Sequence, residues 1–404
     1  MTEIEFSIIP DTQDEFNVIS DQLKEFQAET GVEVHTKRMN WGMAWPELMS
    51  YATQGRGSDI SHIGSTWVSS LVVMNALTPF PTEVVEQVGR MRSYLPAAWQ
   101  SVKVDNSEQI WSIPLSIYTY VFAYRKDKLA QLGLDEETAF STPQEISNTV
   151  NKLYKLDEFA TPWITPIVPM PFNDLIHIAA SWIWNAGGEF MDQTGRRVKF
   201  HEPEALQGLK EYFHVFRYNA IQQDYLGTDA TVESLLKGES AAVITDLRGF
   251  VREMKGNHPQ ELKDNIGIAT TTNTPWCGGS NLVLWRHTKG YPEKLKAAYQ
   301  LAEFLTTKKA MLDIGQKVSK LPARADALEA LFPSESLISP LVQKLNEHGK
   351  SYRSTSAWHR VEYQIGVELG NLLYKNRKMT EDEFNVYMVE QITNLANRLN
   401  LSLA

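Results

Sequence analysis

The chain begins with alternating apolar and polar residues and then changes to a helical spacing of apolar residues. Residues 4–8 alternate with the period of a half-buried strand. Over residues 16–26, apolar side chains recur three and four positions apart, which is one face of a helix. Thr30 and Gly31 then supply a helix stop, and residues 32–34 resume the strand period. The pattern predicts a strand-helix-strand unit, the building block of parallel sheets.

Similar patterns recur along the rest of the chain and indicate an α/β protein. The segment 111–124 has a loose strand period over fourteen residues, which is long for one strand and typical of a crossing between two lobes. Further strands are predicted at residues 59–64, 241–245 and 281–285. Helices are predicted over 45–53, from Pro143, over 178–185, from Pro203 and over 380–399.

Length, composition and charge limit the number of domains and the classes of partner. The chain has 404 residues, more than one ordinary core holds, so two domains are expected. Hydrophobic residues make up 43% and charged residues 22%, as in globular proteins. The net charge of -10 argues against binding to nucleic acid, which requires a basic surface, and against attachment to an anionic membrane.

Cysteine content and hydropathy bear on the compartment. Cys277 is the single cysteine, so no internal disulfide is possible, and we interpret it as a small buried residue. No stretch approaches the about 18 consecutive apolar residues of a transmembrane helix. The chain enters its first strand pattern directly after Met1, with no signal peptide. Either the protein is cytoplasmic, or an export signal was removed.

The common catalytic signatures do not occur in the sequence. There is no phosphate-binding loop, no dinucleotide-binding turn, no nucleophile elbow and no zinc-protease motif. His359 and Glu362 have a helical spacing that allows a shared metal, but two ligands alone are a weak indication. We therefore expect neither a metal nor a cofactor and no enzyme activity. Forty-nine scattered acids leave a glycoside-processing enzyme as an alternative.

A series of short segments occurs in a characteristic order. They are Thr30-Gly31-Val32-Glu33-Val34, Gly57-Ser58-Asp59-Ile60, Asn75-Ala76-Leu77-Thr78-Pro79-Phe80, Trp111-Ser112-Ile113-Pro114 with Tyr124-Arg125-Lys126-Asp127, Ala186-Gly187-Gly188, Lys237-Gly238-Glu239-Ser240, Gly278-Gly279-Ser280 and Leu321-Pro322. Each is short, but together they span nearly the whole chain. In this order the sequence resembles the sugar-binding proteins of bacterial ABC transporters, the family that includes the maltodextrin-binding proteins.

The resemblance implies a two-lobed α/β fold of the periplasmic-binding-protein type II, with a ligand cleft between lobes joined by hinge crossings. The crossings are expected near residues 117, 278 and 325. The first lobe would then hold residues 1–116 plus 281–325, and the second lobe residues 117–280 plus 326–404 with the C-terminal helices.

The resemblance also implies a function. The protein would be the extracytoplasmic binding component of an ABC importer, a monomer that captures a carbohydrate by hinged closure and delivers it to membrane permease subunits. It would be a periplasmic protein or a cell-surface lipoprotein. An acidic or phosphorylated small molecule is the alternative ligand.

Candidate ligand contacts are nominated where strands end, because ligands of open α/β sheets lie beyond the carboxyl ends of strands. Sugars present apolar CH faces and hydroxyl edges, so aromatic side chains with neighbouring polar groups are favoured. On the first lobe and the crossings the candidates are Thr12, Gln13, Trp41, Trp45, Ser65, Thr66, Trp67, Tyr118, Tyr120, Gly279 and Arg324.

On the second lobe, Arg248 stands where the resemblance implies a stacking aromatic. An arginine can bind hydroxyls bidentately, stack as a plane or bind an acidic group, so Arg248, Arg324 and Arg38 are the basis of the acidic-ligand alternative. Trp358 matches another stacking aromatic of the family. The candidates of this lobe are Asp174, His177, Asp246, Arg248, Trp276, Trp358 and His359.

Overall fold

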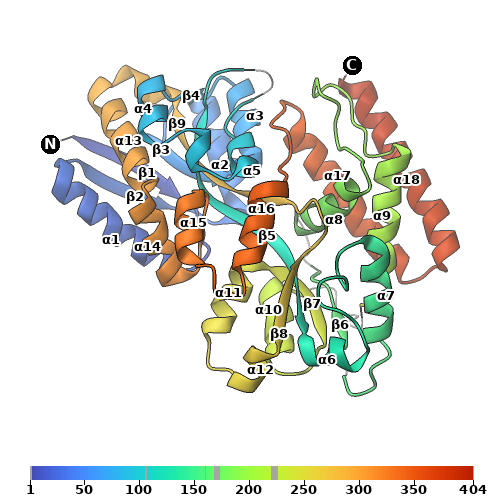
Figure 1. Ribbon diagram of the computed structural model, residues 1–404. Coiled ribbons are helices and arrows are strands. Elements are labelled where there is room, and N and C mark those ends of the chain that lie inside the picture. Colours follow the sequence, from blue (N-terminus) through green and yellow to red (C-terminus); the bar gives the residue numbers. More distant parts are fainter. Residues whose placement is uncertain (1, 105–106, 160, 168–172, 220–225, 404) are drawn as a thin grey trace. The chain divides into compact units, whose positions relative to one another are not determined.

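A computed structural model describes residues 2–104, 107–159, 161–167, 173–219 and 226–403. The chain divides into two compact units, and each is an α/β unit with its own part of the sheet (Figure 1). Unit 1 comprises residues 1–118, 277–342 and 351–359. Unit 2 comprises residues 119–276, 343–350 and 360–404.

The sheet of unit 1 combines parallel and antiparallel neighbours. β1 pairs in parallel with β2 on one side and β3 on the other, as the opening strand-helix-strand pattern predicts. β9 runs antiparallel to β3, β4 pairs with β9, and β10 pairs with the first half of β5. The strands are β1 (Glu3–Ile8), β2 (Glu33–Arg38), β3 (Ile60–Gly64), β4 (Leu77–Thr78), β5 (Ser112–Arg125), β9 (Cys277–Trp285) and β10 (Leu321–Pro322).

The helices of unit 1 pack on this sheet and on one another. α1 lies against α13 and α14, and α13 also contacts β1 (Figure 1). The helices are α1 (Gln13–Thr30), α2 (Trp41–Gln54), α3 (Val68–Val73), α4 (Thr82–Gln87), α5 (Pro96–Gln100), α13 (Pro292–Leu305), α14 (Lys308–Val318) and α15 (Ala325–Leu331). Short 3-10 turns are η1 (Ser65–Trp67), η2 (Met91–Ser93) and η3 (Arg286–Gly290).

Unit 2 is built around the second half of β5. β7 and β8 each run antiparallel to it, and β6 pairs in parallel with β7. Its strands are β6 (Trp163–Ile164), β7 (Ala242–Asp246) and β8 (Ile266–Thr270). Its helices are α6 (Lys126–Gln131), α7 (Pro143–Leu153), α8 (Asn173–Asn185), α9 (Pro203–Phe216), α10 (Thr228–Leu236), α11 (Leu247–Lys255), α12 (Gln260–Asp264), α17 (Trp358–Asn376, from Arg360 on) and α18 (Glu381–Leu403). Helix α16 (Ser339–His348) begins in unit 1 and ends in unit 2.

The division of the chain can be compared with the expected lobes. The long segment predicted around residues 111–124 is one fourteen-residue strand, β5, which passes from unit 1 to unit 2 after Tyr118. The chain returns to unit 1 at Cys277. Residues 326–342 and 351–359 lie in unit 1, whereas the expectation placed them in the second lobe. For residues 326–331 the reason is local, because α15 packs on α14 and β10 and so stays with unit 1.

Helix ends follow the chemistry of their flanking residues. Gly31 ends α1 with φ of 70°, the left-handed conformation that glycine adopts without strain. The Asn40 side chain accepts the amide of Met43 and so begins α2 at Trp41, four residues before the sequence pattern predicts. This early start places Trp41 and Trp45 one turn apart on the same helix.

The apolar core of unit 1 bears directly on the site. One cluster joins α2, β3, α3 and β9, with Leu48, Ile63, Trp67, Leu71 and Trp285 among its buried members. Trp45 packs against this cluster from its partly buried edge. The aromatic residues described below therefore stand on a packed core.

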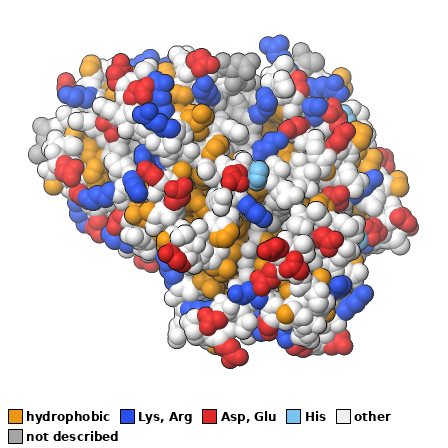
Figure 2. Space-filling model, in the orientation of Figure 1, with side chains coloured by type: hydrophobic (Ala, Val, Ile, Leu, Met, Phe, Trp, Pro, Cys, Tyr) orange, Lys and Arg blue, Asp and Glu red, His pale blue; other side chains and the backbone are white. Residues whose placement is uncertain are grey.

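Figure 2 shows basic and acidic side chains interspersed over the visible face. Among the described helices, none combines the length and the apolar character that a membrane crossing requires.

Candidate functional site

Three tryptophans of unit 1 form one aromatic cluster. The ring of Trp67 lies 5.6 Å from Trp41 and 5.5 Å from Trp45, measured between centroids. Trp41 and Trp45 come from the first turns of α2, and Trp67 comes from η1, directly after β3. Trp67 is only 8% exposed, whereas Trp41 is 39% exposed. The cluster is thus a core-anchored platform whose outer member, Trp41, presents an aromatic face to the surface.

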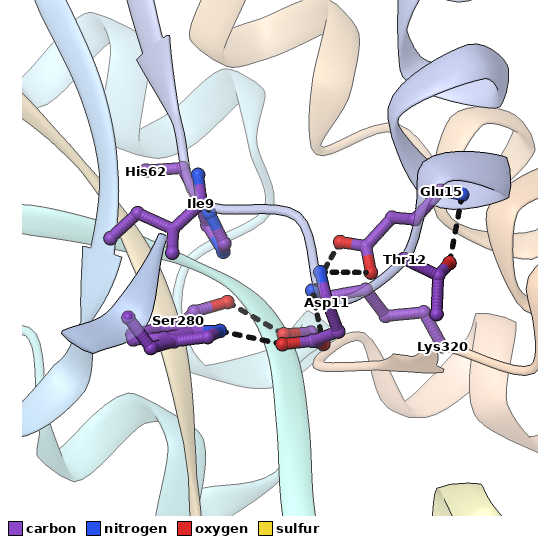
Figure 3. Close-up of polar contacts among 9 residues, drawn as sticks. Ile9, Asp11, Thr12, Glu15, His62, Ser280 and Lys320 are labelled. Carbon is purple, nitrogen blue, oxygen red and sulfur yellow. Dashed lines mark hydrogen bonds and ion pairs between the residues drawn. The ribbon is translucent and has the colours of Figure 1, made fainter. Parts of the chain in front are cut away.

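A buried ion-pair network supports the edge of Trp41. The Trp41 indole Nε1 donates to Asp11 Oδ1 at 2.6 Å. The Lys320 ammonium lies 3.4 Å from Asp11 Oδ2 and 2.5 Å from Glu15 Oε1, and the backbone amide of Asp11 donates to Glu15 at 3.1 Å. Asp11, Glu15 and Lys320 point toward one another (Figure 3). Lys320 therefore fixes a carboxylate at the rim of an aromatic face, and we call these four residues the Asp11 network.

Two charged members of the Asp11 network are buried. Glu15 is fully buried and Lys320 is 7% exposed, so each charge depends on the other for its stability. Thr12 caps α1 by accepting the amide of Glu15 at 3.1 Å, which holds the first turn of the helix in place. The Asp11 carboxylate stands at the more open end of the network, with 32% of its side chain exposed.

His62 lies beside the Asp11 network, inside unit 1. Burial, together with the nearby Lys320 ammonium, lowers the pKa of His62 to about 3. Its Nδ1 accepts the amide of Ile9 at 3.3 Å, so the proton of the neutral ring is on Nε2. The ring meets Trp41 edge-on at 6.0 Å, which makes His62 a neutral support of the aromatic platform.

Several of the residues predicted for unit 1 have structural partners. Gln13 donates to Asn17 and accepts from Arg38 on the exposed side of α1. Ser65 and Gly279 line the same narrow gap, which has no room for a water molecule. A Cβ at Gly279 would lie 2.0 Å from the carbonyl oxygen of Ser116, so the close approach of β9 to β5 requires glycine. Thr66 and Tyr118 are partly buried.

Arg324 is held by groups of its own unit. Its guanidinium makes two hydrogen bonds to Asp326, at 3.0 and 2.9 Å, and one to the carbonyl of Val88 at 3.0 Å. The same group lies over the ring of Tyr94 at 5.7 Å. Arg324 thus joins β10, α15 and the segment before η2, and its charge is already paired.

Trp358 and His359 also lie in unit 1 but face different neighbours. Trp358 stacks on Tyr352 with 4.2 Å between ring centroids and an angle of 26°, so one of its faces is occupied. His359 lies 4.2 Å from Trp45 and extends the aromatic cluster. Burial lowers the pKa of His359, which keeps this ring neutral against Trp45.

Unit 2 carries a second aromatic cluster. Trp276 stacks on His177 with 4.0 Å between ring centroids and 9° between planes, and Tyr120 lies 5.9 Å from Trp276. Ser181 on α8 accepts the backbone amide of Trp276 at 2.8 Å, and Thr119 donates to the Trp276 carbonyl at 2.6 Å. Burial lowers the pKa of His177 to about 3, so a neutral imidazole stacks on the indole.

Buried carboxyl groups adjoin this second cluster. Asp174 accepts the Tyr120 hydroxyl, and Tyr120 is the register partner of Asp246 across β5 and β7. Burial raises the pKa of both aspartates, and the charge of Asp246 raises that of Asp174 further. Asp246 also caps α11 by accepting the amide of Gly249 at 2.7 Å, next to the buried Arg248. The structure thus brings together Tyr120, Asp174, His177, Asp246 and Trp276, as a set of acceptors and flat rings.

Sequence reasoning missed the residues that support the first platform. Glu15 and Lys320 are 305 positions apart, and His62 lies inside a strand, so no local motif connects them. Lys320 precedes the Leu321-Pro322 segment, which was noted only for its family pattern. Buried charges of this kind become visible only when the segments meet in space.

Comparisons with known proteins agree with this architecture. Residues 21–344 match the family described as bacterial extracellular solute-binding proteins. Among curated proteins, no sequence match is found. Many solved structures share the fold, all at low sequence identity in the examples that follow.

Three solved structures illustrate the likeness. An ABC transporter solute-binding protein from Thermotoga lettingae, bound with alpha-D-tagatose, has 16% identity and a TM-score of 0.77 over 98% of this chain and 100% of that chain. The maltose-bound MalE3 of T. maritima has 17% identity and a TM-score of 0.78 over the same shares. The sugar-binding protein MalE of Xanthomonas citri has 16% identity and a TM-score of 0.78 over 98% of each chain.

These likenesses confirm the predicted periplasmic-binding-protein fold. The family match covers well over half of the chain and carries the assignment. The protein belongs to the bacterial extracellular solute-binding proteins, a family that binds solutes outside the cytoplasm rather than transforming them.

Proposed function

We propose that the protein captures a carbohydrate, specifically an oligosaccharide, as the binding component of an ABC importer. The observation that carries this proposal is the pairing of Trp41 with Asp11. A flat, 39% exposed indole lies beside a carboxylate that is oriented by the indole Nε1 and by Lys320. A sugar ring presents an apolar face to such an indole and hydroxyl donors to such a carboxylate.

Charge favours a neutral sugar over an acidic ligand. Two of the three arginines that suggested an acidic ligand have partners within unit 1: Arg324 pairs with Asp326, and Arg38 donates to Gln13 and lies over Phe16. Arg248 lies next to Asp246, whose side chain is 4% exposed. An anion approaching the aromatic cluster of unit 1 would meet the charged carboxylate of Asp11.

The structural neighbours support the same ligand class. Those with named ligands include proteins bound with alpha-D-tagatose and with maltose. A binding protein for a cyclic maltosyl-maltose from Arthrobacter globiformis, with 15% identity and a TM-score of 0.74, extends the set to oligosaccharides. These ligands are known only for those proteins. In this chain, the aromatic clusters are the feature that could contact the apolar faces of a sugar.

The finer parts of the function follow from the family. Delivery of the sugar to membrane permease subunits, a monomeric state and either a periplasmic or a lipoprotein form remain predictions. So does capture of one ligand by both units with hinged closure. The candidates Thr12, Ser65, Thr66, Tyr118, Gly279 and Trp358 stay predictions as ligand contacts.

A ligand screen read by melting temperature tests the proposal. A ligand that binds only the folded protein raises its melting temperature, by an amount that grows with concentration. We expect a rise with neutral oligosaccharides and none with matched uronic-acid oligosaccharides or sugar phosphates. A rise produced only by the acidic series would refute the neutral-sugar proposal. Release of shorter sugars during incubation would contradict the binding role.

A further inference from the structure

A group of metal-binding side chains lies on the outer strands of unit 1, outside both aromatic clusters. The group consists of Glu3 on β1 with Glu33 and His35 on β2, and one ligand atom from each lies within 4.8 Å of the other two. His35 Nε2 is 3.6 Å from Glu3 Oε2 and 3.9 Å from Glu33 Oε1. We propose that Glu3, Glu33 and His35 bind a zinc ion, and we call them the β1–β2 triad.

The strand register explains why these side chains meet. In the parallel pair of β1 and β2, Glu3 lies opposite Glu33, and Glu5 lies opposite His35. Alternate residues of a strand point to the same face, so Glu3, Glu33 and His35 share one face of the sheet. Because β2 is the outermost strand of the sheet order, the triad is reached from solvent without opening the fold.

The β1–β2 triad places two negatively charged glutamates on neighbouring strands. Like charges on neighbouring strands repel each other, and Glu3 and Glu33 are register partners of the parallel pair β1 and β2. Within the described part of the chain, neither glutamate has a lysine or arginine partner. Lys37, the next basic residue on this face, pairs with Glu47 and lies over the ring of Tyr51. A cation between the two glutamates would remove this repulsion.

The ligand types and distances favour zinc among common cations. Zinc accepts imidazole nitrogen and carboxylate oxygen at about 2.0–2.2 Å, which in a tetrahedral site puts neighbouring ligand atoms about 3.4 Å apart. The two separations from the imidazole, 3.6 and 3.9 Å, lie within about half an ångström of that value, and the ligand atoms of the two glutamates lie within 4.8 Å of each other. Calcium and magnesium prefer all-oxygen ligands, so the imidazole selects against them. Three protein ligands leave the fourth position for water.

Zinc titration of the purified full chain, followed by calorimetry, tests the site. We expect one saturable zinc site at about pH 7.5. His35→Gln should lose saturable binding, and Glu33→Gln should weaken it about tenfold or more. These side chains are exposed or half-buried, so the variants are expected to fold.

His348 provides the matched control. It is also an exposed histidine beside a glutamate, with Nε2 at 3.7 Å from Glu347 Oε2, but it has one carboxylate neighbour in place of two. His348→Gln should bind zinc as the wild type does. Failure of the wild type to bind zinc saturably, or unchanged zinc affinity in His35→Gln, would overturn the proposal.

Melting temperature gives an independent readout that requires no sugar ligand. Zinc should raise the melting temperature of the wild type and of His348→Gln, and leave that of His35→Gln unchanged. Calcium at the same concentration should have no such effect. A calcium-induced rise equal to that of zinc would contradict the assignment to zinc.

Discussion

The aromatic cluster of unit 1 and that of unit 2 differ in how they hold charge. In unit 1 the carboxylates of Asp11 and Glu15 are paired with the buried ammonium of Lys320. In unit 2 the carboxyls of Asp174 and Asp246 are buried with raised pKa values, and Asp174 accepts the hydroxyl of Tyr120. The first cluster therefore keeps a charged acceptor at its rim, whereas the second has acids that resist ionisation.

This difference has a physical basis in the fold. Asp11 lies at the end of β1 and is 32% exposed at its side chain, so water and Lys320 both stabilise its charge. Asp246 ends β7 at the start of α11 and is 4% exposed. Hydroxyl groups of a ligand can donate to either kind of carboxyl. The buried carboxyls of unit 2 have little contact with water, so a hydrogen bond from a ligand would take the place of the water that burial excludes.

The largest effect is expected from breaking the charge pair of unit 1. Lys320→Met removes the ammonium that pairs with the fully buried carboxylate of Glu15, which should lower the free energy of unfolding by about 3–5 kcal/mol. Chemical denaturation measures this loss. Lys309→Met is the control, because Lys309 pairs with Glu25 on the exposed surface and its removal should leave stability unchanged. Equal losses in the two variants would show that the Asp11 network is not a buried one.

A slightly smaller loss is expected from the core member of the tryptophan platform. Trp67→Ala removes an 8% exposed ring that packs on Trp41 and Trp45, and it should destabilise the protein by about 3 kcal/mol. Thermal and denaturant unfolding both report it. A variant as stable as the wild type would contradict the core role of Trp67.

A pH-dependent effect should distinguish the acids of unit 2. Burial raises the pKa of Asp174 above its ordinary 3.8, so its contribution to stability is present below pH 3.8 and is lost as the pH rises through the raised value. Asp174→Asn cannot ionise at this position, so it does not lose this stability as the pH rises. The stability of this variant relative to the wild type should therefore increase as the pH is raised from about 4 toward neutrality.

Asp192 in the same unit gives a control of opposite sign. Partial burial opposes ionisation there, but hydrogen bonds from Thr194 and from backbone amides prevail and lower the pKa of Asp192. Its contribution is therefore present above pH 3.8 and lost in acid. Asp192→Asn should be less stable than the wild type at neutral pH and should approach it in acid. The same pH trend in both variants would contradict the raised pKa of Asp174.

The smallest change in stability is expected at the exposed tryptophan. Trp41→Ala removes a 39% exposed ring, so the free energy of unfolding should fall by about 1 kcal/mol or less. Its affinity for an oligosaccharide found in the screen should fall about tenfold or more. Trp41→Phe keeps an aromatic face and should keep most of the affinity. Calorimetric titration measures the affinity of both variants. Unchanged affinity in Trp41→Ala would remove Trp41 from the site.

Much of the fold could be predicted from local patterns. The period-two alternation at residues 4–8 and the apolar spacing over 16–26 correspond to β1 and α1, and Gly31 ends the helix as predicted. Boundaries were less accurate where a cap overrode the apolar pattern. Asn40 begins α2 before its first buried residue, which is why the pattern alone predicted the helix only from Trp45.

The candidate site was predictable in part. Trp41, Trp45 and Trp67 could be nominated because they follow or adjoin strand ends, and the structure places them in one cluster. Arg324 and Gly279 could be nominated from position as well and stay predictions as ligand contacts, but the pairing of Arg324 with Asp326 and the packing of Gly279 on Ser116 could not be predicted. A residue's position along the chain does not reveal which partners already occupy its polar groups or its faces.

The sequence by itself determined the α/β class, the strand and helix order and the family, because these depend on local periodicity and on short segments in a fixed order. Only the tertiary structure decided which charges are paired. Lys320 meets Glu15 and Asp11, and His35 meets Glu3, through contacts between segments distant along the chain or across a sheet. Electrostatic energy depends on distance and burial in space, and neither quantity is written in the spacing of residues along a chain.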